Sequence, residues 1–221
     1  MHQLADDVWQ IPLVPRQAIN AYVIGDVLID AGLTLHAGRI LREVRGRPIT
    51  AHALTHVHND HAGGSRRVSE TLGIPVWVGE GDADALRTGR AAIAPGRRGR
   101  RLMAVYGGSP KVEPARELRE GDEVGPGFVV LETPGHSPGH VSYWRERDGV
   151  LICGDVFFDM SLLTTVPGLR QPPHLFNYDS ARNRESERRL AGLQPRLTLF
   201  GHGPPVRGPE ALTTFTATLP A

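Results

Sequence analysis

The chain has 221 residues, of which 40% are hydrophobic and 22% are charged, a composition typical of a folded globular protein rather than a disordered one. The 25 basic residues nearly balance the 24 acidic ones, and the net charge of +1 lacks the strong basic excess of a dedicated nucleic-acid-binding protein. A single cysteine, Cys153, stands against ten histidines, which excludes an internal disulfide framework and every multi-thiolate metal site.

The first third of the chain predicts strands, and then strands that alternate with helices. Short β-branched runs predict strands at 8–14, 21–24 and 27–29, and Gly25 with Asp26 predicts the tight turn of a hairpin. Apolar residues at helical spacing predict a helix over 35–44. A buried strand at 49–54, a helix over 62–72, a strand at 75–78 and a short helix at 82–86 follow.

The second half of the chain begins again with strands. Residues 89–110 are rich in Gly, Pro and Arg without any period, so we expect a long surface loop there. Strands are expected near 118 and at 128–132, 141–144 and 150–153, and an apolar long loop at 156–177. Asp179 or Ser180 can cap a helix that carries Leu190 and Leu193, and a strand at 196–200 and a helix over 210–219 complete the chain.

This order of elements predicts two βα halves in one domain over residues 1–221, packed sheet on sheet with the helices outside. The N-terminal residues have no basic region followed by an apolar stretch, and no window approaches the roughly 20 apolar residues that span a bilayer. We therefore expect a cytoplasmic protein without a membrane partner.

The most informative segment runs from Thr55 to His61. His56 and His58 lie two residues apart just beyond a predicted strand, so on extended backbone both rings point to one side and can reach one ion. Asp60 and His61 follow where the chain turns toward a helix, and they can face a neighbouring point. Imidazole and carboxylate groups together suit zinc, iron or manganese.

Three further candidates follow predicted strands, each beside glycine or proline: His136, Asp155 and His202. Active sites of α/β proteins gather side chains at such strand ends. A lone histidine there is more often a surface or core residue than a ligand. Here, however, four ligand-type residues fall within six positions and three more candidates accompany them, which argues against a purely structural interpretation.

Three of the remaining histidines belong to no such group of candidates. We assign no role to His2, His36 and His52. His140 is expected to be a packing or supporting group, and His174 to be exposed to solvent.

From the turn at Asp30 to the segment around His202, the chain resembles the metallo-β-lactamase superfamily. The residues that carry the resemblance, in family order, are His56, His58, Asp60, His61, His136, Asp155 and His202. The resemblance implies an α/β fold, a four-layer αβ/βα sandwich of two mixed β-sheets flanked by helices, with two metals at one sheet edge.

The resemblance also implies a role for each of these residues. The first metal would be held by His56, His58 and His136, and the second by Asp60, His61 and His202. Asp155 would bridge the two metals, and Asp30 would support the ligands from behind. The cofactors would be two divalent metal ions, with zinc favoured and iron or manganese as alternatives.

Two metals about 3.5–4 Å apart can share a water and lower its pKa to about 7. The resulting bridging hydroxide would attack a small ester, thioester or lactone carbonyl, and Asp60 would orient it and pass a proton to the leaving group. Two alternatives of the same fold remain open: a mononuclear iron oxidoreductase similar to persulfide dioxygenases, and a phosphodiesterase or ribonuclease. Because the net charge is near zero, we expect a small-molecule partner rather than a nucleic acid. The sequence leaves the oligomeric state open, and a homodimer is one possibility.

The subtype can be sorted in part. The segment around His136 and the histidine-rich second site resemble the glyoxalase II and lactonase branches, whereas β-lactamases that place a cysteine at the second metal are disfavoured. Phe158 stands where the acyl-homoserine lactonase type tends to place a tyrosine. The apolar residues of 156–177 pack either onto the core or around an acyl or aromatic group of a substrate. The arginines of 89–110 form either a solvated loop or an anion-binding lid.

Overall fold

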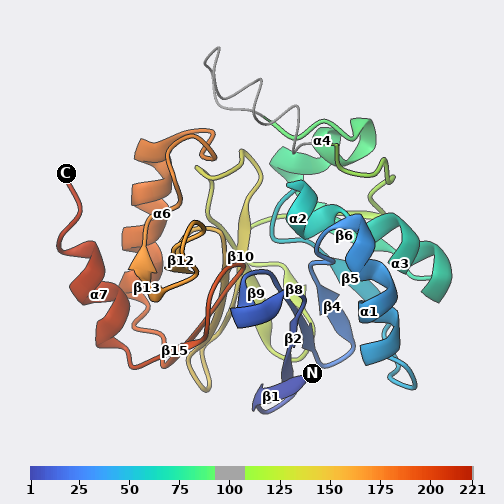
Figure 1. The fold of residues 1–221 in the computed structure, drawn as a ribbon, viewed down its shortest axis with the longest axis horizontal. Helices are drawn as coiled ribbons and strands as arrows, with labels where there is room; N and C mark the ends of the chain where they lie inside the picture. The colour runs from blue at the N-terminus through green and yellow to red at the C-terminus, as the bar shows by residue number, and fades with distance from the viewer. Residues whose placement is uncertain (93–107, 221) are drawn as a thin grey trace.

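Two mixed β-sheets lie face to face in the structure, a computed structural model that describes residues 1–92 and 108–220 (Figure 1). The first sheet has seven strands that follow one another in chain order. They are β1 (His2–Ala5), β2 (Val8–Pro12), β3 (Asn20–Ile24), β4 (Val27–Ile29), β5 (Ala51–Ala53), β6 (Val76–Gly79) and β7 (Arg116–Leu118). Strands β1 to β4 pair antiparallel, and β4 to β7 pair parallel because helices connect them.

The second sheet has six strands in the order β15-β14-β11-β10-β9-β8. They are β8 (Glu123–Val124), β9 (Phe128–Glu132), β10 (Val141–Arg145), β11 (Val150–Gly154), β14 (Leu197–Phe200) and β15 (Val206–Arg207). Only the β11–β14 pair is parallel, and a helix again makes the crossover between the two strands. The register places Leu151 beside Thr198 and Gly154 beside Phe200, so these two strands end at the same edge.

Helices cover the outer face of each sheet (Figure 1). Beside the first sheet lie α1 (Ala37–Glu43), α2 (Asn59–Ala62), α3 (Ser65–Leu72) and α4 (Ala83–Thr88), and beside the second lie α6 (Ser180–Gly192) and α7 (Glu210–Thr216). The four layers confirm the predicted αβ/βα sandwich. Among the described residues, no helix combines the length and the apolar character that crossing a membrane requires.

The main core fills the space between the sheets. Tyr22 and Ile29 from the first sheet meet Phe128, Tyr143 and Ile152 from the second, and all five are buried. Burying one large apolar side chain stabilises the fold by roughly 1.5–3 kcal/mol. Separate apolar clusters join each sheet to its helices. This double-sided packing explains why the strand sequences read as continuous apolar runs rather than as strict alternations.

Hydrogen bonds tie the two sheets together near the edge where the ligand candidates lie. The Tyr22 hydroxyl donates to the Phe200 carbonyl at 2.7 Å, and the Tyr143 hydroxyl donates to the Leu54 carbonyl at 2.7 Å. The Asn20 amide N–H donates to the Gly201 carbonyl at 3.0 Å. These bonds fix the segments that lead to His56 and His202 against the opposite sheet.

Most predicted elements are present, but several boundaries were wrong. The strand predicted at 8–14 ends at Pro12, and the helix predicted over 62–72 corresponds to α3, which begins only at Ser65, after α2 has ended at Ala62. The helix predicted over 35–44 begins with a 3₁₀ turn, Thr34–His36, and ends at Glu43. Strands β1, β8 and β15 were not predicted. Asp179 caps α6, accepting hydrogen bonds from the backbone N–H groups of Ala181 and Arg182, as expected.

The prediction of a loop at 156–177 was wrong in part. Strands β12 (Phe158–Met160) and β13 (Pro167–Arg170) pair antiparallel within this segment and form the β12–β13 hairpin, residues 158–170. Of the loop predicted at 89–110, residues 93–107 lie outside the described residues. The described ends approach each other through a bridge between Arg90 and Gly108.

Candidate metal centre

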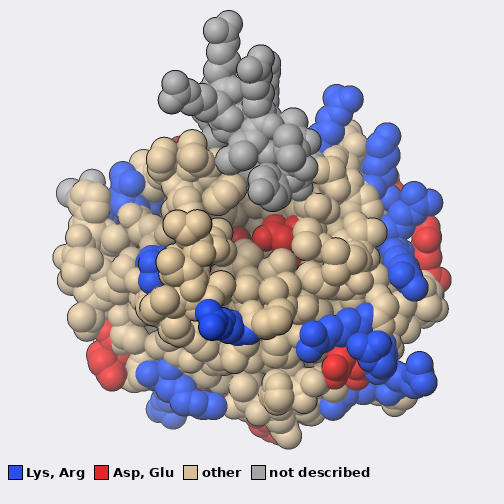
Figure 2. Space-filling view, in the orientation of Figure 1, with Lys and Arg blue, Asp and Glu red and all other residues tan. Residues whose placement is uncertain are grey.

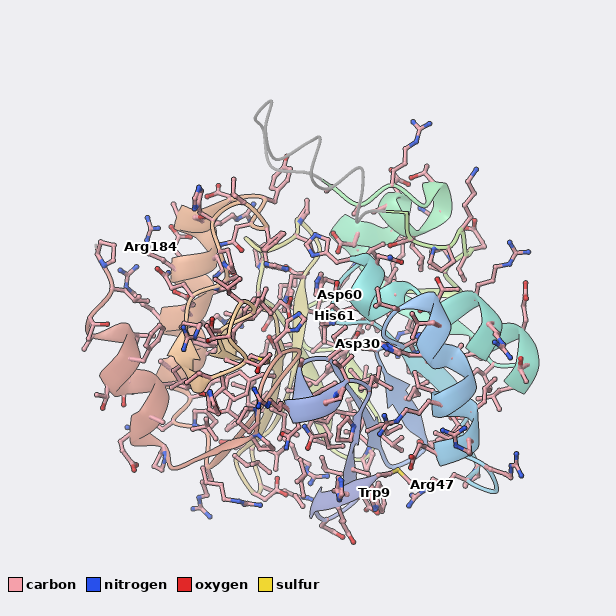
Figure 3. All side chains as sticks on the ribbon, in the orientation of Figure 1. Trp9, Asp30, Arg47, Asp60, His61 and Arg184 are labelled. Carbon is pink, nitrogen blue, oxygen red and sulfur yellow. The ribbon has the colours of Figure 1, made fainter. Side chains whose placement is uncertain are left out.

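The seven ligand candidates follow the ends of β5, β9, β11 and β14 or occupy the first turn of α2. His56 and His58 follow β5, and Asp60 and His61 lie in α2, which begins one residue after His58. His136, Asp155 and His202 follow β9, β11 and β14. All seven come together at one edge of the sandwich, and Figure 3 shows Asp60 and His61 side by side there.

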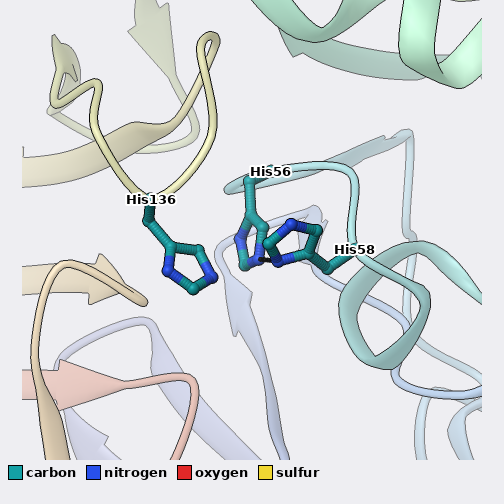
Figure 4. A group of neighbouring side chains, drawn as sticks. All are labelled: His56, His58 and His136. Carbon is teal, nitrogen blue, oxygen red and sulfur yellow. Dashed lines mark hydrogen bonds between the residues drawn. The ribbon is translucent and has the colours of Figure 1, made fainter. Parts of the chain in front are cut away.

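The three histidines expected at the first metal, His56, His58 and His136, form a tight group. His56 Nε2 and His58 Nδ1 lie 3.0 Å apart, and His136 faces both rings (Figure 4). One ligand atom from each of these three residues lies within 4.8 Å of the other two. The rings of His56 and His136 meet edge to face with centroids 4.8 Å apart. Three imidazoles therefore converge on one point.

Asp60, His61 and His202 form a second group, in which one ligand atom from each residue again lies within 4.8 Å of the other two. His202 Nε2 lies 3.3 Å from Asp60 Oδ2. The His61 ring is buried, whereas the Asp60 side chain is 35% exposed and is the most accessible of the seven candidates. A second ion could be held here, next to the first.

Asp155 lies between the two groups. Its Oδ2 is 3.3 Å from His136 Nε2 and 3.2 Å from His202 Nε2, and its Oδ1 is 3.3 Å from His61 Nε2. His56 Nε2 is 3.9 Å from Oδ2. A single buried carboxylate thus contacts histidines of both groups, which is the position a bridging ligand requires.

Further side chains orient the ligands from behind. Asp30 accepts a hydrogen bond from His61 Nδ1 at 2.8 Å and two more from Thr55. The Ala18 carbonyl accepts a hydrogen bond from His202 Nδ1 at 2.6 Å. A hydrogen bond at one ring nitrogen directs the other nitrogen toward the site and fixes the tautomer.

Two glycines permit this crowding. A Cβ at Gly201 would lie 2.1 Å from Asp155 Oδ1 and 2.5 Å from the His61 ring, so any side chain there would displace a ligand candidate. Gly154 adopts φ of 51°, and a Cβ there would lie 2.8 Å from the Thr55 Cβ. The site therefore requires glycine directly before both Asp155 and His202, because a side chain at either position would collide with the site.

The pKa values of the clustered residues are shifted in different directions. Burial, and then the neighbouring His136, lower the pKa of His58 to about 3, so that ring is neutral with a free lone pair. Burial also disfavours protonation of His202, but the carboxylates of Asp155 and Asp60 together outweigh burial and raise the pKa of His202 to about 10. Burial disfavours the charged form of Asp155, yet His202 and His61 hold its pKa well below the usual range. The carboxylate is therefore charged at neutral pH and attracts cations.

These residues fit divalent metal ions. Within the described chain, three buried ring nitrogens lack hydrogen-bond partners: Nε2 of His58, His61 and His136. A buried polar group without a partner costs about 1–3 kcal/mol, so a bound cation would relieve this cost. Imidazole and carboxylate groups are ligands that zinc, iron and manganese accept. Metal binding would release the protons that His61 and His202 hold.

Comparisons with known proteins agree with this geometry. The family model described as the metallo-beta-lactamase superfamily matches residues 14–202. The chain belongs to this superfamily. It is 31% identical to the probable metallo-hydrolase YflN of Bacillus subtilis over 211 residues, which cover 86% of this chain and 80% of the relative. It is 34% identical to the acyl-coenzyme A thioesterase MBLAC2 of Gallus gallus, over 64% of this chain and 57% of that protein.

A solved structure of the same fold is TTHA1623 in a di-iron-bound form. The TM-score is 0.69 with 30% sequence identity, and the match covers 96% of this chain and 98% of that chain. This agreement over nearly the full length confirms the superfamily fold.

The structure brings together all seven residues of the predicted ligand set, and it places Asp30 behind them as expected. His140 is buried, and its Nε2 accepts a hydrogen bond from the Asp155 amide N–H at 3.1 Å, which fits a supporting group. His52 is buried between Leu28 and Ser65, and His174 is exposed.

Two supporting residues were missed. Asn177 contacts His136, and Asp82 joins the loops that carry His58 and His136. Both act across long sequence separations, and no local pattern marks either one. Cys153 is a buried residue of β11 and not a ligand candidate.

A pocket of about 790 Å³ opens over the candidate metal ligands. Figure 2 shows acidic side chains at the bottom of a hollow in this face, surrounded by largely uncharged surface. Two sides of the pocket are apolar, one beside β2 and β3 and the other on the β12–β13 hairpin. Apolar residues that line it include Val14, Ile19, Leu33, Phe158, Leu162 and Phe176. The apolar segment at 156–177 thus contributes both to the core and to a pocket wall.

Proposed function

We propose that this chain is a dinuclear metal-dependent hydrolase that acts on a small ester, thioester or lactone carbonyl. The observation that carries the proposal is the position of Asp155, which contacts histidines of both ligand groups. Family membership and the metallo-hydrolase name of YflN support hydrolysis. Zinc is the favoured metal, and the di-iron form of TTHA1623 makes iron the principal alternative.

His56, His58 and His136 would hold one metal, Asp60, His61 and His202 the other, and Asp155 both. When bound, two such metals lower the pKa of a water molecule and polarise the substrate carbonyl. No serine or cysteine nucleophile is then needed, which agrees with the buried position of Cys153.

Asp60 is the group we assign to proton transfer. Its side chain is the most exposed of the seven and lines the pocket, while its Oδ2 remains within 3.3 Å of His202. Burial opposes ionisation, but the hydrogen bond from His202 and the charges of His61 and His202 together outweigh it and lower the pKa of Asp60. The carboxylate is thus charged, reaches the bound substrate and can orient a water or pass a proton to the leaving group.

The pocket supports an acyl substrate. Phe158 packs its ring 4.6 Å from the His202 ring and so limits solvent access beside the ligands. Apolar walls on both sides favour the aliphatic or aromatic part of an acyl group. The thioesterase name of MBLAC2 adds weight to thioesters within the class.

The test combines metal analysis with a substrate panel. Purified protein is expected to carry two metal ions per chain and to hydrolyse members of a panel of lactones, thioesters, β-lactams and phosphodiesters, with all activity lost on chelation. His58→Ala should lower kcat/KM by at least about 100-fold because a metal-dependent contribution of several kcal/mol is lost. His2→Ala, at an exposed histidine, serves as the control. One iron per chain with oxygen uptake, or hydrolysis that survives chelation, would overturn the proposal.

A further inference from the structure

Arg170 is a cation in a pocket whose walls are largely apolar. It ends β13 and lines the pocket together with the ligand residues Asp60 and Asp155. Besides histidines, Arg170 is the only basic residue among those that line it in the described chain. The mechanism proposed above gives this guanidinium no role.

The β12–β13 hairpin directs Arg170 toward the site. Arg170 pairs directly with Phe158 across the two strands. Directly opposite residues of an antiparallel pair project to the same face, with Cβ atoms about 4.5–5.5 Å apart. The Phe158 ring lies against His202 and reaches His136, with centroid distances of 4.6 and 6.3 Å. Arg170 therefore stands one side chain away from the ligand histidines.

The neighbouring residue anchors this end of the hairpin. Gln171 Nε2 donates a hydrogen bond to Glu187 Oε2 at 2.8 Å, and Glu187 is buried in α6. The backbone beside Arg170 is thus fixed to a helix of the core. The backbone that carries the guanidinium is therefore already in place before a ligand binds.

The guanidinium retains free donors. Arg170 Nε donates to the Gly168 carbonyl at 3.0 Å, and this is the only side-chain hydrogen bond that it makes to residues 1–92 and 108–220. In the same part of the chain no carboxylate lies within ion-pair distance of it, although its charge opposes the burial that raises the pKa of Asp159 to about 6. Its terminal amino groups remain available, and their planar arrangement suits a two-oxygen anion.

We propose that Arg170 binds a carboxylate of the substrate, so that the substrate is an acyl ester or thioester with one apolar chain and one carboxylate. This inference rests on the proposed hydrolase function and narrows its substrate class. Apart from the histidines of the ligand cluster, the described lining of the pocket offers one cation, Arg170, between apolar walls, which favours a singly charged carboxylate over a doubly charged phosphate because the latter costs more to desolvate. Binding of this group would hold the apolar chain against Phe158 and Leu162, with the carbonyl toward the metal ligands.

The direct test measures binding to metal-free protein, in which a carboxylate has no metal to coordinate. The ligands are N-octanoylglycine and its neutral match N-octanoylglycinamide, and calorimetry gives the dissociation constants. Wild type is expected to prefer the carboxylate by about tenfold, the effect of one charge-assisted contact. Arg170→Gln should abolish this preference and leave binding of the amide within about twofold. Arg67→Gln, on the exposed face of α3, should change neither.

Three results would overturn the inference. These are an absence of preference in wild type, an equal loss of both ligands in Arg170→Gln, and tighter binding of N-octanoylphosphoethanolamine than of the carboxylate. Arg170→Lys keeps the charge without the planar group, and it should retain part of the preference.

Turnover by metal-loaded protein separates this inference from the proposed function. For octanoyl thioesters with and without a carboxylate, Arg170→Gln should raise KM only for the charged member of the pair and leave kcat unchanged. If neither thioester is hydrolysed by loaded wild type, the hydrolase proposal fails, whereas the binding result on the metal-free chain still decides the role of Arg170.

Discussion

His136 Nδ1 donates a hydrogen bond to Asn177 Oδ1 at 2.8 Å, across 41 residues of sequence. Both side chains are buried, and the bond turns His136 Nε2, which has no other hydrogen-bond partner in the described chain, toward His56 and His58. Asn177 therefore fixes both the orientation and the tautomer of one ligand candidate. In metal sites such supporting hydrogen bonds carry much of the affinity.

Replacing Asn177 should therefore weaken metal binding. We expect Asn177→Leu to lower the metal affinity about 10–100-fold, because the ring loses its acceptor and can rotate. Competition with a chromophoric chelator measures this directly. Asn177→Asp keeps an acceptor oxygen and should retain most of the affinity. Equal affinities for wild type and Asn177→Leu would remove Asn177 from the site.

Asp82 joins two of the ligand loops. Its carboxylate accepts hydrogen bonds from the Val57 amide N–H at 3.0 Å, the Ser137 hydroxyl at 2.6 Å and the Gly139 amide N–H at 2.8 Å. It is buried on the turn that follows β6. One carboxylate thus sets the distance between the loop of His58 and the loop that follows β9.

Removing this carboxylate should destabilise the protein even without metal. Asp82→Ala leaves buried N–H donors without acceptors, and we expect a loss of about 2–4 kcal/mol in the free energy of unfolding, measured with urea on metal-free protein. Asp84→Ala, two residues away at a side chain that is 94% exposed, should cost less than about 1 kcal/mol. Similar losses in the two variants would contradict the bridging role.

The ligand candidates could be predicted because each is marked locally. The spacing of His56 and His58 after a strand, and glycine before Asp155 and His202, are visible within a few residues of sequence. Asn177 and Asp82 carry no such mark, because their roles come from contacts across 41 residues and across 25 to 57 residues. Such contacts exist only once the two sheets have packed.

The secondary structure, too, could be predicted where its signal is local and not where it depends on long-range contacts. Strands with β-branched runs, such as 128–132 and 150–153, lie where they were expected. Strand β13 was missed because it contains Pro167 and Gly168, residues that disfavour strands and that a two-stranded edge tolerates. Its hydrogen bonds to β12, rather than its own composition, make it a strand. Arg170 became a pocket residue only through this pairing.

Glu187 should give the fold a measurable pH dependence. It is buried in α6, and burial raises its pKa to about 7 from the ordinary value of 4.5. Because the folded state holds the proton more tightly than the unfolded state, Glu187 stabilises the fold most below about pH 4.5 and loses this contribution as the pH rises to about 7. The shift corresponds to a loss on the order of 3 kcal/mol.

The variant Glu187→Gln isolates this effect, because it is neutral at every pH. Its free energy of unfolding relative to wild type should rise between about pH 4.5 and 7 and then level off. The difference between the two proteins cancels the titration of the metal-site residues. Glu185→Gln, at an exposed position of the same helix, should show no such trend. A difference that is flat with pH, or that falls, would show that folding does not raise the pKa of Glu187.

Leu163 offers a test of the acyl pocket that leaves the fold untouched. It lies at the tip of the β12–β13 hairpin and lines the pocket, although 93% of it is exposed. An octanoyl chain that leaves the pocket along this wall would cover part of the leucine, a contact worth roughly 1 kcal/mol. Leu163→Ser should then raise KM for an octanoyl thioester about fivefold and leave KM for the acetyl thioester unchanged. Leu35→Ser, at another exposed leucine outside the pocket lining, controls for general surface effects. If Leu163→Ser alters both thioesters alike, the acyl chain takes another path, because a contact at the rim can only be made by the longer chain.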